Sequence, residues 1–432
     1  MKRKAIGAAL AATLLMSSTI TGFANEIVVP EMKPANIEMR NSTELKIKKG
    51  NQKILCVMYN MDNAPFDERH TEHFYYKQLF GNNPSSLKNY VKNQSNGHFN
   101  VSPADTKGTK YPGIVKINVK AKAEYSSNAD DFSLSNKFIR DTLPQIKDKV
   151  DWGLIDTNHD KKFEEDYLRN SLGNNDELLI INIISGEAPN MRFRDPGKVI
   201  AWPHVNLLNT YVGDYHLNHS TVIASEFQKK EVGYATLAHE FMHDIGARDM
   251  YKDEDSIDFW SLMASTRGRR EGESDYTPGP LDPIHKIFFG WKTPKPVKFD
   301  KNGNATIKFK KDEIPYVQDT RNSDIVYFLD YHDLKDMNEK SLNYHGVYSD
   351  GVTVWKVHKS EAKRDWVYNP YGDNDFYINS RGAGTAMSVM TRSKKNLQSP
   401  IHSYIKVNSS KSIDGTMYKV DVKNKQIIVH KR

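Results

Sequence analysis

One short segment constrains the fold of this chain more than any other, because its spacing fits a helix that ends abruptly. It reads H-E-F-M-H-D-I-G-A-R-D. Residues four apart lie on one face of a helix, so the imidazoles of His239 and His243 can converge on one ion, with Glu240 beside it. Gly246 can adopt a left-handed conformation, end the helix and reverse the chain. The reversal would bring Asp249 back toward the two histidines.

This arrangement is typical of catalytic zinc. Such sites keep three protein ligands and an open position for water, whose pKa the metal lowers to about 7. We therefore predict that His239, His243 and Asp249 bind zinc. Glu240 would be the general base that accepts the water's proton and returns it to the leaving amine. The alternatives are a chance occurrence of the motif on an ordinary helix and, for Asp249, a capping role with a more distant third ligand.

The N-terminus has the pattern of a secretory signal peptide. Basic residues at 2–4 precede an apolar run over 5–16, and a small-residue cleavage pattern ends at Ala24. We expect residues 1–24 to be removed and the mature protein to be secreted in soluble form. No later stretch of the sequence approaches the roughly 18 apolar residues that a membrane span needs, so none is predicted.

Charge and cysteine content narrow the class of function. The formal net charge of +7 falls to +4 without the three basic residues of the signal peptide. Such a mild excess, with no basic patch interleaved with aromatics, predicts no nucleic-acid partner. Cys56 is the single cysteine, so no intramolecular disulfide can form. Within its apolar run it is expected to be buried and inert; the alternative is a thiol that blocks the zinc in a latent form.

The rest of the pattern predicts an α+β fold with two domains. Residues 25–51 are expected to form an N-terminal arm or short pro-segment, 52–295 the zinc-peptidase catalytic domain, and 296–432 a C-terminal β-sandwich. Strands are expected at 54–58, 113–119, 178–184, 199–202, 305–309, 325–329, 351–357 and 417–429. Helices are expected at 71–80, at 132–150 with a kink at Pro144, and at 281–291. A further helix that ends at 91 is expected to be capped by a serine of Pro84-Ser85-Ser86.

A second candidate metal site precedes the zinc motif. In a calcium loop, side-chain oxygens come from positions 1, 3, 5 and 9, and a backbone carbonyl comes from position 7. The corresponding residues here are Asp156, Asn158, Asp160, Glu164 and, for the carbonyl, Lys162. Lys161 replaces the usual turn glycine, and Tyr167 stands where a bidentate glutamate is usual. The alternative is a solvated acidic turn.

Taken together, these features resemble the secreted metallopeptidases of the immune inhibitor A type, also called thuringilysin-like, which belong with the metzincins. The resemblance spans roughly residues 50–360. It is carried by segments 53–62, 79–97, 151–160, 201–202, 239–251, 261–265, 289–291 and 351–355. The resemblance implies a metzincin-like catalytic domain with the zinc ligands and general base already named. It also implies that Met263 is the methionine of the turn beneath the metal.

The chain departs from the family pattern near the zinc motif. Met242 stands where family members commonly have glycine, and Ala247-Arg248 replaces Leu-Pro after the motif glycine. Some metzincins place a tyrosine two residues after the turn methionine, but here that residue is Ser265. No residue is therefore assigned to stabilise the oxyanion.

The predicted function is that of a secreted zinc endopeptidase acting on extracellular proteins or peptides, with zinc as the catalytic metal and calcium as a structural one. Two other classes stay open. One is a secreted binding protein or adhesin whose zinc is structural, and the other is a zinc amidase acting on cell-wall material. The presence of Glu240 favours an enzyme, because a structural zinc site needs no general base.

Overall fold

The computed structural model describes residues 49–83, 86–122, 132–163, 177–188, 203–227, 230–231, 234–247, 250, 260–264, 278–340, 342–343, 347–358, 387–389, 404–413 and 417–431. The expected signal peptide, the N-terminal arm up to residue 48 and the strand at 199–202 lie outside these residues. So do two predicted metal ligands, Glu164 and Asp249.

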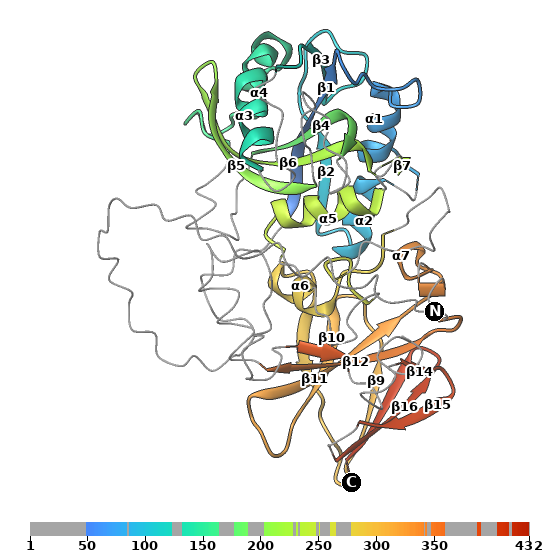
Figure 1. Ribbon diagram of the computed structural model, residues 1–432. Helices are drawn as coiled ribbons and strands as arrows, with labels where there is room; N and C mark the ends of the chain where they lie inside the picture. Colours follow the sequence, from blue (N-terminus) through green and yellow to red (C-terminus); the bar gives the residue numbers. More distant parts are fainter. Residues whose placement is uncertain are drawn as a thin grey trace, which may run out of the picture.

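A seven-stranded sheet forms the centre of the N-terminal half (Figure 1). Its strands are β1 (Gly50–Met61), β2 (Phe99–Pro103), β3 (Ile114–Val119), β4 (Leu178–Ala188), β5 (His204–Val212), β6 (Tyr215–Phe227) and β7 (Lys230–Glu231). The order is β2-β1-β4-β6-β5, with β3 beside β1 and β7 beside β6. Strands β1 to β4 and β6 run parallel, while β5 and β7 are antiparallel to β6. A sheet dominated by parallel strands is usually covered on both faces.

Helices cover both faces of this sheet. They are α1 (Glu72–Phe80), α2 (Leu87–Gln94), α3 (Phe132–Thr142), a 3-10 helix (Leu143–Lys149), α4 (Trp152–Ile155) and α5 (Tyr234–Asp244). Successive residues of a strand point to opposite faces. Cys56 and Met58 of β1 accordingly pack with α1, α2 and α5, whereas Leu55 and Val57 pack with α3 and the 3-10 helix. Burial raises the pKa of the Cys56 thiol, as expected for an inert side chain.

Local signals explain where several helices begin and end. The Thr71 hydroxyl accepts the Phe74 N–H at the start of α1, and the Ser86 hydroxyl accepts the Asn89 N–H at the start of α2. The single kinked helix expected over 132–150 is instead an α-helix followed by a 3-10 helix. Pro144 is the physical reason, because it lacks the N–H that would continue the α-helical hydrogen bonding.

The C-terminal half contains two further sheets. The six-stranded sheet consists of β8 (Thr293–Pro296), β10 (Glu313–Gln318), β11 (Ile325–His332), β12 (Gly351–His358), β13 (Met387–Val389) and β14 (Tyr404–Lys406). The four-stranded sheet consists of β9 (Asn304–Lys308), β15 (Ser409–Ser412), β16 (Tyr418–Lys423) and β17 (Gln426–Lys431). Apolar residues of both sheets share one core, including Tyr327 and Val352 from the first and Val420 and Val429 from the second. The two sheets therefore pack face to face, while the expected domain boundary at 295/296 stays a prediction.

The zinc-motif helix α5 lies at the junction of the two halves. Figure 1 shows α5 and α6 (Pro283–Phe288) between the seven-stranded sheet and the C-terminal strands. One continuous apolar core runs from α5 through Trp260 and Trp291 to Phe328 of β11 and Trp355 of β12. The helix is thus held by side chains from both halves. Within the described residues, no helix has the length and apolar character needed to cross a membrane.

Candidate metal centre

The zinc-motif helix is almost wholly buried. Every residue of α5 except Thr236 is buried, and the side chains of the motif share this environment. His239 is 2% exposed, Glu240 8% and His243 5%. Three polar side chains on one short helix are costly to bury unless their polar atoms are engaged. Their surroundings therefore decide what the helix can do.

Each histidine ring is oriented by a backbone carbonyl. His239 Nδ1 lies 2.9 Å from the carbonyl oxygen of Leu262, and His243 Nδ1 lies 2.9 Å from that of Ala247. A carbonyl oxygen only accepts, so each Nδ1 carries the hydrogen and each Nε2 of a neutral ring presents a lone pair. This is the tautomer that metal-binding histidines adopt when the other ring nitrogen donates to the protein.

The two Nε2 atoms converge at a spacing that suits a tetrahedral ion. They lie 3.1 Å apart, with ring planes at 86°. At that distance two lone pairs repel each other unless a cation or a proton lies between them. Two nitrogens bound to tetrahedral zinc at about 2.0–2.1 Å are about 3.3 Å apart. The donor set and its spacing therefore fit zinc.

The end of α5 contributes directly to this geometry. Gly246 has a φ of +104°. Its N–H donates to the carbonyl of His243 at 2.8 Å, and the Ala247 N–H donates to the carbonyl of Met242 at 2.8 Å. These are the two bonds of a Schellman ending, which needs a left-handed residue where this glycine stands. The same ending presents the Ala247 carbonyl to His243, so the glycine predicted to stop the helix also helps to orient a ring.

Met250, four residues after Gly246, lies in the same apolar core as α5. Met250 is the first described residue after Ala247, and its N–H donates to the carbonyl of Met263 at 2.9 Å. Met263 itself is fully buried. Asp249 immediately precedes Met250 but lies outside the described residues. The roles of Asp249 as third ligand and of Met263 beneath the metal stay predictions.

A second group of acidic residues gathers at the predicted calcium loop. Oxygens of Asp156, Asp160 and Glu177 all lie within 4.8 Å of one another. Asp156 is 4% exposed. One oxygen of Asp156 and one of Glu177 are buried without a hydrogen-bond partner among the described residues. Two such carboxylate oxygens are expensive to bury, and a cation between them would offset that cost.

The described part of the loop brings together two of the predicted ligands. Asp156 and Asp160 come together as expected, and Asn158 Oδ1 accepts the Asp160 N–H at 2.9 Å. The Lys162 N–H donates to Asp160 Oδ1 at 2.7 Å. Lys161, which replaces the usual glycine, has a φ of +60°, so the left-handed turn is kept without glycine. The predicted ligand Glu164 lies outside the described residues.

Glu177 is the residue that sequence reasoning missed at this site. Its Oε1 accepts the Thr157 hydroxyl, the Thr157 N–H at 2.7 Å and the Asn158 N–H at 3.1 Å. It is far from the loop in sequence but directly precedes β4, which begins at Leu178. An acidic residue at the edge of a buried strand was the available signal, and spacing within the loop could not reveal it.

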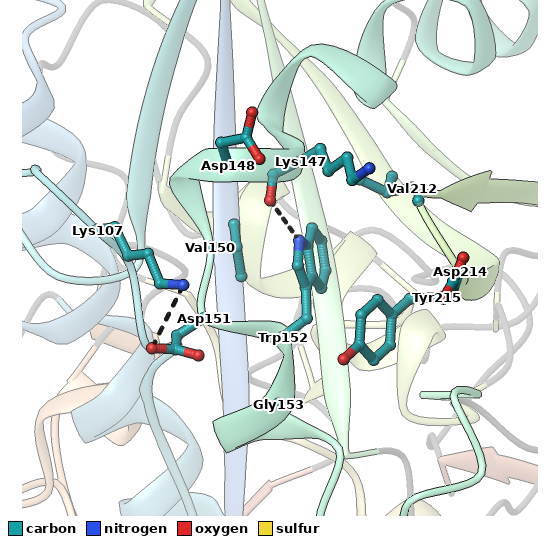
Figure 2. Close-up of a pocket in the computed structure, with 11 residues that line it drawn as sticks. Lys107, Lys147, Asp148, Val150, Asp151, Trp152, Gly153, Val212, Asp214 and Tyr215 are labelled. Carbon is teal, nitrogen blue, oxygen red and sulfur yellow. Dashed lines mark hydrogen bonds and ion pairs between the residues drawn. The ribbon is translucent and has the colours of Figure 1, made fainter.

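A pocket of about 490 Å³ is lined by residues of the 3-10 helix, α4 and the turn between β5 and β6 (Figure 2). Trp152 and Tyr215 stack within its lining at 5.7 Å between ring centroids. Lysines 107 and 147 and aspartates 148, 151 and 214 also line it. The lining contains no residue of α5 or of the 260–264 turn. Its mixed charges favour no class of ligand, so we do not assign the pocket to the candidate metal centre.

A buried polar network connects the zinc-motif helix α5 to the sheet, and sequence reasoning did not predict it. Asp244, the last residue of α5, lies with Oδ1 2.5 Å from Nδ1 of His219, and its Oδ2 accepts the Thr221 hydroxyl at 3.0 Å. His219 and Thr221 belong to β6. The network therefore joins the end of the motif helix, one residue after His243, to a central strand of the sheet.

Comparison with known proteins identifies no family for this chain. No family model matches the chain, and no curated protein matches it. Among solved structures, catalytically inactive OgpA from Akkermansia muciniphila, in complex with an O-glycopeptide substrate, is similar at a TM-score of 0.30 and 12% identity. The match covers 73% of this chain and 92% of that one. At this identity and TM-score the likeness carries no argument.

Proposed function

We propose that this chain is a secreted zinc-dependent endopeptidase of the immune inhibitor A type, with His239, His243 and Asp249 as zinc ligands. One observation carries the proposal. Both histidines of the motif donate through Nδ1 to backbone carbonyls, and their Nε2 atoms face each other at 3.1 Å on a buried helix. A pair of core histidines gains nothing from two lone pairs that face each other, whereas metal-ligating histidines almost always donate their other ring N–H to a partner of this kind.

The proposed reaction is hydrolysis of a peptide bond. Zinc, when bound, polarises the scissile carbonyl and lowers the pKa of water to about 7. Glu240 follows His239 on the same buried helix and is proposed to accept the proton of the attacking water. The water oxygen bonds to the carbonyl carbon, the carbon–nitrogen bond breaks, and Glu240 returns the proton to the departing amine.

The proposed substrates are extracellular proteins or peptides. The N-terminal sequence supports export, because a basic start, an apolar run and a small-residue cleavage pattern follow in the order of a signal peptide. An enzyme that acts outside the cell meets proteins and peptides as substrates.

We further propose that the metal at the acidic loop is calcium and that its role is structural. Calcium prefers oxygen ligands, and Asp156, Asp160 and Glu177 supply only oxygens. The ion would join the loop to the beginning of β4, because Glu177 lies next to that strand. A soft metal would instead favour sulfur or imidazole ligands.

The test of the peptidase proposal compares the wild-type protein with Glu240→Ala and Glu240→Gln. Purified wild type is expected to bind about one zinc ion, to digest casein and quenched peptides, and to lose activity in phenanthroline. Both variants are expected to bind zinc but to turn over at least about a hundredfold more slowly. Folded, zinc-loaded wild type that cleaves no member of a broad peptide library would contradict the proposal. Hydrolysis of peptidoglycan but not of peptides would favour the amidase class.

A further inference from the structure

We infer that Asp282, acting through Ser261, is a positioning residue that holds the 260–264 turn where the Leu262 carbonyl fixes the ring of His239 for zinc. The inference rests on the proposed function, since it concerns the metal-binding competence of the same histidine. It adds a residue that lies outside the zinc motif and that no ligand spacing predicts.

The turn makes two contacts with the metal-binding part of the chain. The carbonyl oxygen of Leu262 lies 2.9 Å from His239 Nδ1, and that of Met263 accepts the Met250 N–H at 2.9 Å. Met250 directly follows the predicted ligand Asp249. A displacement of the turn would therefore move both the ring of one ligand and the backbone next to another.

Asp282 and Ser261 hold the turn from the opposite side. The Ser261 hydroxyl donates to Asp282 Oδ2 at 2.7 Å and accepts the Met263 N–H at 3.1 Å. The hydroxyl thus bridges the carboxylate to the backbone of the turn. Leu262 adds a backbone bond, because its N–H donates to the carbonyl of Pro280 at 2.9 Å. Both anchors come from the segment that leads into α6.

This anchoring segment is itself fixed. Asp282 Oδ1 accepts the N–H groups of Ile284 and His285 at 3.0 Å, which caps α6, and Oδ2 lies 2.5 Å from His285 Nδ1. The Leu281 N–H donates to Gln94 Oε1 of α2 at 2.8 Å. Asp282, Ser261 and His285 are all at most 1% exposed. A buried carboxylate with four donors leaves Ser261 little freedom to move.

The charge state of Asp282 is consistent with this role. Burial would raise its pKa, but the neighbouring His285 and the hydrogen bonds from His285 and Ser261 outweigh burial and lower the pKa below its usual value. The carboxylate is therefore ionised at neutral pH and accepts the Ser261 hydrogen, so that the serine oxygen stays available to the Met263 N–H.

The experiment measures zinc affinity in Ser261→Ala, Asp282→Asn and a matched control, Asp319→Asn. Asp319 is also buried and also accepts two backbone N–H groups and one hydroxyl, from Arg321, Asn322 and Tyr327, but it lies at the end of β10 in the C-terminal sheet. Zinc dissociation constants would be measured by competition with a chromophoric chelator, and unfolding of the metal-free proteins would be followed by urea titration. Cobalt-substituted samples report the ligand field by their visible absorption.

We expect both turn variants to bind zinc about tenfold more weakly, the lower end of the range seen when an outer partner of a ligand is removed. Their cobalt spectra should shift, and Ser261→Thr, which keeps the hydroxyl, should bind zinc like the wild type. Asp319→Asn should lose stability but keep its zinc affinity. Wild-type affinity in both turn variants, or an equal loss in the control, would overturn the inference and leave the peptidase proposal intact. A folded wild type that binds no zinc would overturn the proposed function itself.

Discussion

The two carboxylate oxygens of Glu177 have different surroundings, and the difference indicates where a cation would bind. Its Oε1 accepts three hydrogens from Thr157 and Asn158, which fixes the direction of the side chain. Its Oε2 is buried and has no partner among the described residues. The three bonds fix the carboxylate within the acidic group, where a cation would satisfy the buried oxygens of Glu177 and Asp156.

The residue-scale prediction concerns Glu177→Gln, which keeps the shape of the side chain but removes its charge. Calcium at about a hundred times its dissociation constant should stabilise the wild type by about 2.7 kcal/mol, which corresponds to a rise in melting temperature of roughly 5 °C. The variant should show little or none of this rise in differential scanning fluorimetry. Glu68→Gln, a change at an exposed site on the protein surface, should respond like the wild type. An equal response in Glu177→Gln would place calcium elsewhere.

At the scale of elements, the helices whose starting signals are local in sequence were predictable. Thr71, Ser86 and Asp282 each cap the helix that follows them, and each forms a side-chain bond to a backbone N–H. The hairpin of β5 and β6 was not predicted. Its strands are rich in His, Asn, Ser and Thr, so they lack the continuous apolar run that marked β1 and β4.

The candidate metal centre also has features that were predictable from the sequence and features that were not. The convergence of the two histidines follows from helical spacing, and the helix ending follows from Gly246, so both were predictable. The groups that hold the His239 ring and the 260–264 turn in place were not predictable. Leu262 contributes a backbone carbonyl, which any residue type could supply, and Asp282 acts across a long separation in sequence. Only the folded chain brings such groups together.

The element-scale prediction is that Gly246→Ala weakens both the helix ending and the zinc site. A φ of +104° is unfavourable for any residue with a Cβ, so we expect a loss of about 1–2 kcal/mol in the free energy of unfolding. The Ala247 carbonyl that orients His243 depends on this ending, so zinc should also bind more weakly. Gly303→Ala is a control with a φ of +74° in the C-terminal half. It should lose stability and keep its zinc affinity; equal zinc affinity in Gly246→Ala would contradict the link.

At the scale of the whole molecule, the junction between the two halves contains a buried ion pair as well as apolar side chains. Lys292 follows α6, and its Nζ lies 2.9 Å from Asp330 Oδ1 of β11. Both side chains are less than 10% exposed. Burial would raise the pKa of Asp330, but Lys292, His332 and Lys286 outweigh it and lower the pKa to about 2. The ion pair thus joins β11 to the short segment between α6 and β8.

This pair predicts how acid should affect the protein. The pKa of Asp330 is lower in the folded chain than its ordinary value of 3.8, so its contribution is complete above that value and is lost as the pH falls toward about 2. The stabilisation lost when Asp330 becomes protonated is on the order of 2 kcal/mol. Asp330→Asn should be about 3–5 kcal/mol less stable than the wild type at neutral pH, because it leaves Lys292 buried without its carboxylate. Urea unfolding at pH 6 and at pH 2.5 should therefore show the difference between the two proteins narrowing in acid. A difference that stays constant would mean that this ion pair does not form in solution.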